Sequence, residues 1–381
     1  MRLVTIRPEA EEAGTGDDAT GPANRVALVL DGGRLLPLGA LAKLEPAGLP
    51  MDIGRIDLAT ILSRDPDLAA IREALSRADA AMLAGTALDP ATVRLAAPIP
   101  RPGKIIGVGY NYLDHVREQG LERPTRPVLF SMFANAVTAD GLPIRHPAGT
   151  HALDLEAELA VVIGRRARRV SVVDAARCVA GYTAANDVTA RDWQGQAKAL
   201  RPGEKGDGQW LRAKGSDTFL PLGPVLVTTD ELGDGRGLGV RSWLTTARSA
   251  DGVRSWLTTA RSTDGVRSWR TAATGPDANR PFQMQDGNTS DLLFSVAELI
   301  SLISEEVTLD PGDVIVTGTP SGVGVFREPQ VFLEPGDLVT VEVEHIGSLT
   351  NPITDVEGRA PEGSPAALFL AARAGRTGSE R

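Results

Sequence analysis

Cysteine is almost absent from this chain of 381 residues, which contains only Cys178. One thiol cannot form an intramolecular disulfide and cannot supply a cysteine-based zinc site. Histidine is also scarce, with four residues, so we do not expect a histidine cluster for zinc. Cys178 lies in a helical pattern without a base nearby in the sequence, which argues against a role as nucleophile.

Long apolar runs are missing as well. No segment reaches the roughly 18 apolar residues of a membrane-spanning helix, and the first residues lack the charged-then-apolar pattern of a signal peptide. The formal net charge of −9 argues against nucleic acid or an anionic membrane surface as the main partner. We therefore expect a cytoplasmic protein that binds neither nucleic acid nor membrane.

Two common catalytic motifs are absent. The glycine-rich segment GTPSGVG (318–324) lacks the Gly-Lys-Ser/Thr ending of a phosphate-binding loop. The chain has no Gly-x-Ser-x-Gly nucleophile elbow. With no nucleophile in evidence, the sequence favours chemistry by a metal ion and an activated water.

Strand and helix patterns divide the chain into two parts. Strands are predicted at 1–8 and 25–38, the latter folded on itself by a hairpin turn at Asp31–Gly33, and helices at 56–84. The proline-rich PIPRPG (98–103) is a plausible linker. We predict a small N-terminal α/β domain at 1–98, a main domain at 99–360 and a tail at 361–381.

The main domain is rich in strand-like runs, from 104–108 onwards, with helical pieces at about 172–180, 188–199 and 292–304. These patterns predict a β-rich α+β fold built on a strongly twisted sheet or roll. A 13-residue segment beginning GVRSW occurs three times between 239 and 277. We favour a tandem duplication that lengthens a hairpin or loop over a partner-binding arm, and expect no catalytic role for it.

A pair of acids precedes an apolar run in DLEAELAVVIG (154–164). Glu156 and Glu158 are two apart, so on a strand they share a face, and if buried they need a compensating partner. Asp187 can add a third carboxylate, giving an oxygen site suited to Mg²⁺, Mn²⁺ or Ca²⁺. A solvated strand face carries the same Glu-x-Glu pattern, so both interpretations stay open.

Four further residues can carry chemistry. His115 and Glu118 share one face of a short predicted helix, where the carboxylate can orient the imidazole as a general base, although a chance surface pair is equally compatible with the pattern. Arg191 can pair with Asp187, in a helix that Thr189 could cap. Lys214 lies in a polar loop, where lysine is usually solvated.

The loop GTPSGVG follows an apolar strand. Its backbone N–H groups and the Thr319 hydroxyl would meet at the strand's end, where they could hold a carboxylate.

Eight segments, in this order, resemble the fumarylacetoacetate hydrolase family: KIIGVGYNYLDHVRE, PVLF, LDLEAELAVVIG, VAGYTAANDVTARDWQ, AKGSDTFLPLGP, QDGNTSDLLFSVAELI, LDPGDVIVTGTPSGVG and LEPGDLVTVEVEHIGSLTN. They cover about residues 101–352, with the repeat as an interruption. The resemblance implies a mixed β-roll catalytic domain, a homodimer, and one Mg²⁺ or Mn²⁺ per site.

The resemblance also implies roles for single residues. Glu156, Glu158 and Asp187 match metal ligands, and His115 and Glu118 match a water-activating pair. Lys214 matches a catalytic residue, and Arg191, Gln194 and Thr319 match positions that contact substrate. Two departures are Met132, where the family often has lysine, and Leu155, where an aromatic residue is common.

These features predict a metal-dependent enzyme that cleaves a C–C bond in 2-oxo or 1,3-diketo acids by hydrolysis. A hydratase, isomerase or decarboxylase of 2-oxo-dienoates in aromatic catabolism would use the same residues, because fold and ligands do not choose among these reactions. The remaining alternative is a non-catalytic descendant that binds a partner.

Overall fold

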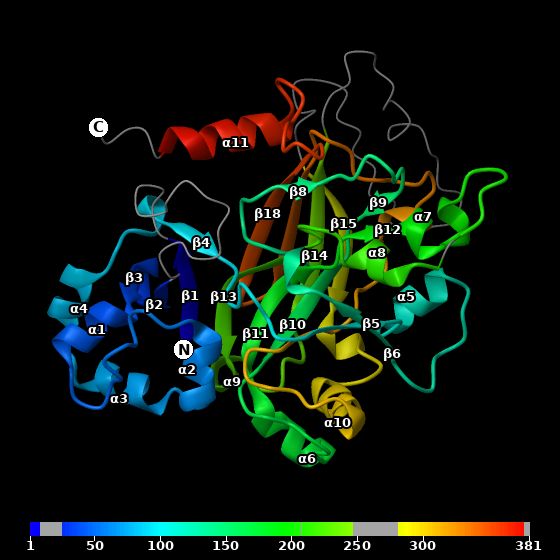
Figure 1. The fold of residues 1–381 in the computed structure, drawn as a ribbon. Helices are drawn as coiled ribbons and strands as arrows, with labels where there is room; N and C mark the ends of the chain where they lie inside the picture. The colour runs from blue at the N-terminus through cyan, green and yellow to red at the C-terminus, as the bar shows by residue number, and fades with distance from the viewer. Residues whose placement is uncertain (8–24, 207, 247–280, 377–381) are drawn as a thin grey trace.

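The computed structural model describes residues 1–7, 25–206, 208–246 and 281–376, and two β-sheets form its centre (Figure 1). The larger has eleven strands, with the order β3-β2-β1-β13-β11-β10-β16-β5-β6, while β4 pairs with β1 and β7 with β13. The smaller has five strands, with the order β15-β14-β17-β18-β8. The β-rich α+β fold predicted from the sequence is confirmed.

The strands of the larger sheet are β1 (Arg2–Arg7), β2 (Arg25–Val29), β3 (Leu35–Pro37), β4 (Arg94–Ala96), β5 (Ile105–Gly109), β6 (Val128–Met132), β7 (Val137–Thr138), β10 (Ala157–Ile163), β11 (Val179–Asn186), β13 (Leu220–Thr228) and β16 (Val314–Val316). Those of the smaller sheet are β8 (Ile144–Arg145), β14 (Gly239–Thr245), β15 (Phe282–Asn288), β17 (Leu338–Val343) and β18 (Gly347–Thr354). A separate short pair joins β9 (Leu153–Asp154) to β12 (Thr189–Ala190).

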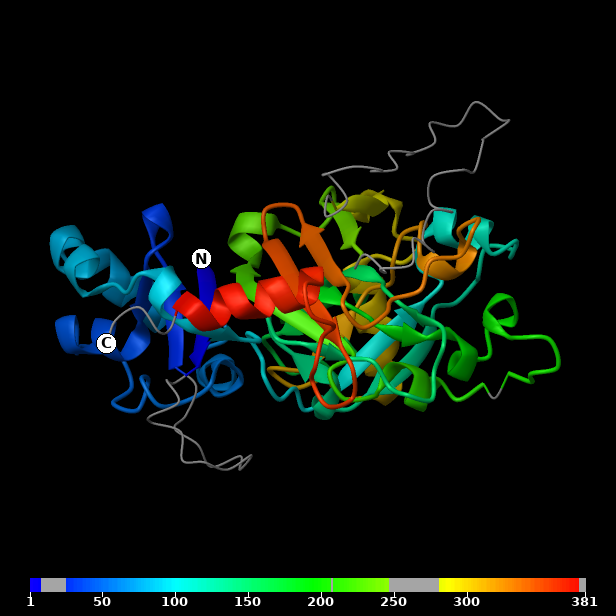
Figure 2. The same cartoon turned by 90° about the horizontal axis from the view of Figure 1, so that it is seen from above.

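The helices lie around these sheets. They are α1 (Leu38–Leu44), α2 (Leu58–Arg64), α3 (Ala69–Arg77), α4 (Ala80–Thr86), α5 (Leu113–Glu118), α6 (Val172–Ala175), α7 (Arg191–Gln194), α8 (Trp210–Lys214), α9 (Thr229–Leu232), α10 (Val296–Glu306) and α11 (Pro365–Arg376). Figure 2 shows α1–α4 at one end of the molecule and α11 extending toward them from the second sheet. No helix among the described residues is long and apolar enough to cross a membrane.

Strand β10, in the middle of the larger sheet, is buried on both of its faces. Leu159 and Val161 face a core shared with the second sheet, whereas Ala160 and Val162 face a core shared with the N-terminal helices. Every residue of β10 is buried. A strand covered on both faces is expected to be continuously apolar, as this run is.

The N-terminal segment is joined to the main sheet by backbone pairing. β1 lies antiparallel to β13, with Arg2 opposite Val227 and Leu3 opposite Leu226. The predicted strands at both ends of the Asp31–Gly33 turn form a hairpin, as expected, and the predicted helical region 56–84 contains α2, α3 and α4. The boundary near residue 98 stays a prediction.

Two local predictions were wrong or only partly right. Thr189 does not cap a helix: it belongs to β12 and donates its hydroxyl to the carbonyl of Asp187, and Ala190 stands at the N-cap of α7 without a side-chain acceptor. The helix expected at 188–199 is limited to α7 and a 3₁₀ turn, Ala197–Ala199. Of the 13-residue repeat, β14 contains the beginning of the first copy and pairs with β15, whereas residues 247–280 lie outside the described part of the chain.

Candidate active site

Three buried carboxylates meet at one end of β10 and β11. The two strands are antiparallel, with Ala157 opposite Asn186 and Glu158 opposite Ala185, so Asp187 comes to lie beside Glu156 and donates its N–H to the Glu156 carbonyl at 2.9 Å. Glu156, Glu158 and Asp187 each offer an oxygen within 4.8 Å of the other two. The shared face predicted for the glutamates is therefore real, and it is buried instead of solvated.

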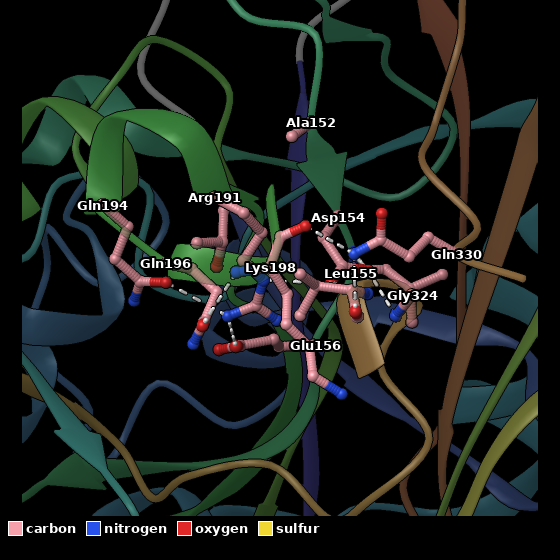
Figure 3. Close-up of polar contacts among 12 residues, drawn as sticks. Ala152, Asp154, Leu155, Glu156, Arg191, Gln194, Gln196, Lys198, Gly324 and Gln330 are labelled. Carbon is pink, nitrogen blue, oxygen red and sulfur yellow. Dashed lines mark hydrogen bonds and ion pairs between the residues drawn. The ribbon is translucent and has the colours of Figure 1, made fainter. Parts of the chain in front are cut away.

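Two buried cations contact this triad. The Lys214 ammonium, at the end of α8, donates to Glu156 Oε2 and Asp187 Oδ2, both at 2.6 Å. Arg191, at the start of α7, pairs through Nη1 with Glu156 Oε1 at 2.7 Å and through Nε with Asp154 Oδ2 at 2.9 Å (Figure 3). Lys214 is thus not a solvated loop lysine, and Arg191 pairs with these two acids instead of the Asp187 suggested by its spacing.

The environment moves the pKa values of the three carboxyls in different directions. Burial would raise the pKa of Glu156, but the charges of Lys214 and Arg191 outweigh it and lower that pKa to about 2. Burial and the charge of Glu156 raise the pKa of Asp187 to about 7, against the effect of Lys214. Burial, Asp187 and Glu156 together raise the pKa of Glu158 well above its ordinary value. Without a metal ion, the site therefore disfavours the state in which Glu156, Asp187 and Glu158 are all ionised.

The donor set fits a divalent metal ion. Four buried carboxylates, including Asp154, face two buried cations, which leaves an excess of two negative charges when all are ionised. Asp187 Oδ1 is buried without a hydrogen-bond partner among the described residues. Three carboxylates with no sulfur or imidazole ligand suit Mg²⁺ or Mn²⁺. Among the described residues, this triad is the group of acids, histidines or cysteines placed to hold an ion.

His115 and Glu118 form the pair predicted on α5. Nδ1 of His115 lies 2.5 Å from Glu118 Oε1, and His115 as a whole is 6% exposed. A carboxylate at Nδ1 makes that nitrogen the donor and leaves Nε2 as the basic atom. The ring also lies edge-on to Phe326, with centroids 6.0 Å apart. The pair is therefore not a chance surface pair, and its geometry would allow His115 to act as an oriented base.

The segment GTPSGVG binds carboxylates, but they are the protein's own. The N–H groups of Gly318, Ser321, Gly322 and Gly324 donate respectively to Glu158, Asp114, Glu118 and Asp154. These N–H groups are therefore not free for a substrate, which corrects the sequence-based expectation.

The Thr319 hydroxyl is engaged in the same way. It donates to the Ala157 carbonyl at 2.9 Å and accepts from Gln285 Nε2 at 2.7 Å. It can still accept one more hydrogen bond, through its second lone pair.

A cavity of about 190 Å³ opens above the triad. Eight of the nine residues predicted for the site line this cavity. The ninth, Glu118, lies behind the wall and contacts the lining residue His115. An aromatic pair, Phe130 and Trp210, closes one side with ring centroids 5.4 Å apart. Met132, which replaces the family's lysine, is buried in the core and is not among the cavity-lining residues.

Sequence reasoning missed three contributors: Asp154, Asp114 and Gln285. Asp154 had a signal, because it precedes Glu156 by two residues and so continues the alternation that singled out the two glutamates. Asp114 and Gln285 act on backbone and hydroxyl groups far away in the sequence, and no local pattern marks them.

Comparisons with known proteins agree with the resemblance found in the sequence. Residues 104–354 match the model of the fumarylacetoacetate (FAA) hydrolase C-terminal domain. The chain is 36% identical over 356 residues to a Xenopus laevis protein named oxaloacetate tautomerase fahd2, mitochondrial, covering 93% of this chain and 90% of that one.

Solved structures agree as well. A fumarylacetoacetate hydrolase from Exiguobacterium antarcticum superposes with a TM-score of 0.65 at 26% identity, over 93% of this chain and 99% of that one. A 5-carboxymethyl-2-hydroxymuconate delta-isomerase from Mycobacterium smegmatis gives 0.53 at 37% identity, over 71% and 85%. The relatives thus include a tautomerase, a hydrolase and an isomerase on one scaffold.

Proposed function

The chain belongs to the fumarylacetoacetate hydrolase family, and from this premise we propose that it is a metal-dependent tautomerase of small 2-oxo dicarboxylic acids such as oxaloacetate. The observation that carries the proposal is the oriented His115–Glu118 pair facing two cations across a cavity of about 190 Å³. That space suits a compact acid. Keto–enol exchange needs a base and an acid close to the substrate, but no room for an attacking water or a leaving fragment.

Arg191 has a free donor for the substrate. Its Nη2 is buried without a hydrogen-bond partner among the described residues, although Nε and Nη1 are engaged. Arg191 lines the cavity, and an unpaired guanidinium N–H on such a residue favours a carboxylate as its partner. Gln194 accepts from Nη1 at 3.3 Å and lines the same wall, so it can orient both the arginine and the bound acid.

Two side chains, His115 and Lys214, would then exchange protons with the substrate. Nε2 of His115 would take a proton from C3 of the keto acid and return it there in the reverse direction, while Glu118 stabilises the imidazolium. The Lys214 ammonium would hydrogen-bond the 2-oxo oxygen as it gains negative charge and give it a proton, which completes the enol. The proton held by His115 and the vacancy left on Lys214 would then be exchanged with solvent, and the reverse direction runs the same transfers backwards. Held by Glu156, Glu158 and Asp187, a Mg²⁺ or Mn²⁺ ion would supply Lewis-acid polarisation of that oxygen.

Hydrolytic C–C cleavage of acylpyruvates, which the sequence favoured, is the second candidate. The same His115–Glu118 pair could deprotonate a water, and a solved relative carries the hydrolase name. The small cavity in front of the pair favours the tautomerase, because hydrolysis must also place a water beside the substrate. The family's homodimer and a cytoplasmic location also stay predictions, and the Xenopus relative is named as mitochondrial.

The test follows the spontaneous ketonisation of enol-oxaloacetate by its ultraviolet absorbance. We expect the protein with Mg²⁺ to accelerate the decay, and both EDTA and His115→Gln to abolish the acceleration. Acetylpyruvate cleavage, followed in parallel, tests the second candidate. Cleavage of acetylpyruvate without any effect on oxaloacetate would overturn the tautomerase proposal in favour of hydrolysis.

A further inference from the structure

Asp154 is a fully buried carboxylate that belongs to none of the roles proposed so far. It ends the short strand β9, and its exposed fraction is 0%. Its side chain contacts both α7 and the 3₁₀ turn Gly324–Phe326, so it joins a wall of the site to the turn behind it (Figure 3).

Four donors occupy its two oxygens. Oδ1 accepts the N–H groups of Leu155 and Gly324, each at 2.8 Å. Oδ2 accepts the Val325 N–H at 3.0 Å and Nε of Arg191 at 2.9 Å. Since all these partners are donors, only an ionised carboxylate satisfies them, and an amide would turn an N–H toward one pair.

The contact with Arg191 fixes the direction of its guanidinium. Asp154 holds Nε and Glu156 holds Nη1, which leaves Nη2 as the buried nitrogen without a partner among the described residues. A guanidinium is a rigid planar fork, so holding two of its nitrogens sets where the third points. Asp154 makes no contribution to the cavity wall itself, whereas Arg191 does.

The contacts with Gly324 and Val325 add a second constraint. They hold the 3₁₀ turn whose Phe326 ring lies edge-on to His115. There is no space for a shift at this point, because a Cβ on Gly324 would overlap the Val331 carbonyl oxygen and lie 2.7 Å from Asp154 Oδ1. One carboxylate thus fixes both the guanidinium of Arg191 and the turn that places Phe326 against His115.

We propose that Asp154 is a positioning residue, which aims Nη2 of Arg191 at the carboxylate of the bound acid and so governs substrate affinity. The proposal deepens the proposed function and rests on it for the identity of the substrate. It predicts a change in KM and in the affinity for a carboxylate probe, not merely a loss of stability.

The chain offers a matched control in Asp313. This side chain is 1% exposed, accepts the N–H groups of Lys104 and Asp310 at 2.8 and 2.7 Å, and pairs with the Lys104 ammonium at 2.8 Å. It precedes β16, at the end opposite to the site. Asp313→Asn therefore removes a buried, cation-paired backbone acceptor without touching the cavity.

The experiment compares wild type, Asp154→Asn, Asp313→Asn, Arg191→Lys and the double variant Asp154→Asn/Arg191→Lys. Calorimetry with oxalate at saturating Mg²⁺ reports anion affinity, oxaloacetate kinetics report KM and kcat, and thermal unfolding reports stability. We expect both asparagine variants to melt earlier, but only Asp154→Asn to raise the oxalate Kd and the KM, by about tenfold or more. In the Arg191→Lys background the same change should raise them less than threefold, since the two residues act as one unit.

Unchanged oxalate affinity and KM in a folded Asp154→Asn protein would overturn the proposal and leave a structural role. The proposal would also be overturned if, in the double variant, the fold-changes in oxalate Kd and KM equal the product of those in the two single variants. Asp154 would then act independently of Arg191. If Asp154→Asn does not fold, Asp154→Ser, which keeps an acceptor oxygen, is judged by the same outcomes. Wild type that binds oxalate but does not turn over oxaloacetate would refute the proposed function alone, because the oxalate titrations still test Asp154.

Discussion

Glu158→Gln should stabilise the metal-free protein while removing its response to Mg²⁺. The amide oxygen of the substituted side chain can still accept the Gly318 N–H that Glu158 Oε2 accepts at 2.7 Å, so the change removes charge more than contact. At an effective dielectric constant of about 20, two ionised carboxylates 4.8 Å apart repel by about 3.5 kcal/mol. Glu158 has two such neighbours.

This repulsion, added to burial, raises the pKa of Glu158 and costs stability as the pH rises. The pKa of Glu158 is raised in the folded state, so the native protein holds a proton that the unfolded chain releases above about pH 4.5. Folding stability therefore falls as the pH rises toward the folded-state pKa, by up to about 1.4 kcal/mol per pH unit for this group. Glu158→Gln lacks that slope.

The assay is thermal and urea unfolding in EDTA at pH 5.5 and 7.5, then with Mg²⁺. The advantage of Glu158→Gln should grow between the two pH values by up to about 3 kcal/mol, or about 6 °C in melting temperature. Mg²⁺ at one hundred times its Kd should stabilise wild type by about 2.7 kcal/mol and the variant hardly at all. A pH-independent difference, or equal stabilisation by Mg²⁺, would refute the reasoning.

Three further predictions concern the site and its support. Mg²⁺ binding should release protons and strengthen as the pH rises through about 7, since the pKa of Asp187 is raised to about 7. Calorimetry in two buffers of different ionisation enthalpy measures the number of protons released, and a binding enthalpy that does not depend on the buffer would contradict the prediction. Glu118→Gln should lower kcat for oxaloacetate about 100-fold and leave oxalate affinity within threefold, because it orients His115 without lining the cavity; a loss of affinity alone would argue against that role. Arg72→Ala should lower the free energy of unfolding by about 0.5–1 kcal/mol at neutral pH, since its exposed pair with Asp230 lowers the pKa of that acid. Urea titrations should show this difference vanish as the pH falls through the lowered pKa of Asp230. An unchanged difference in acid would contradict the pairing argument.

The sequence was most informative where residues with reactive side chains follow the spacing of a strand or of a helix. Two glutamates two apart on an apolar strand predicted a shared face, buried or solvated, and the structure shows it buried. His115 and Glu118 on one helical turn predicted neighbouring side chains, and the structure places them in contact. Lys214 could not be placed in this way, since nothing in a polar loop shows that its ammonium will bridge two acids.

The partner of Arg191 was mispredicted for a similar reason. Helical spacing pointed to Asp187, but the chain turns through β12 before α7 begins, and the arginine then faces Asp154 and Glu156. The backbone acceptors that hold 318–325 were also out of reach, because a carboxylate that binds N–H groups leaves no trace in the spacing of those residues.

The position of β16 has a consequence for how the protein is made. This short strand lies between β10 and β5 in the sheet, although Gly318, just after it, is separated in the chain by 160 residues from Glu158, to which it donates its N–H. A ribosome adds about 5–20 residues per second, so the edge of β10 waits unpaired for several seconds while the intervening segment emerges. The hydrogen bond from Gly318 to Glu158 can form only after that segment has emerged, so we expect added Mg²⁺ to slow unfolding far more than it speeds folding.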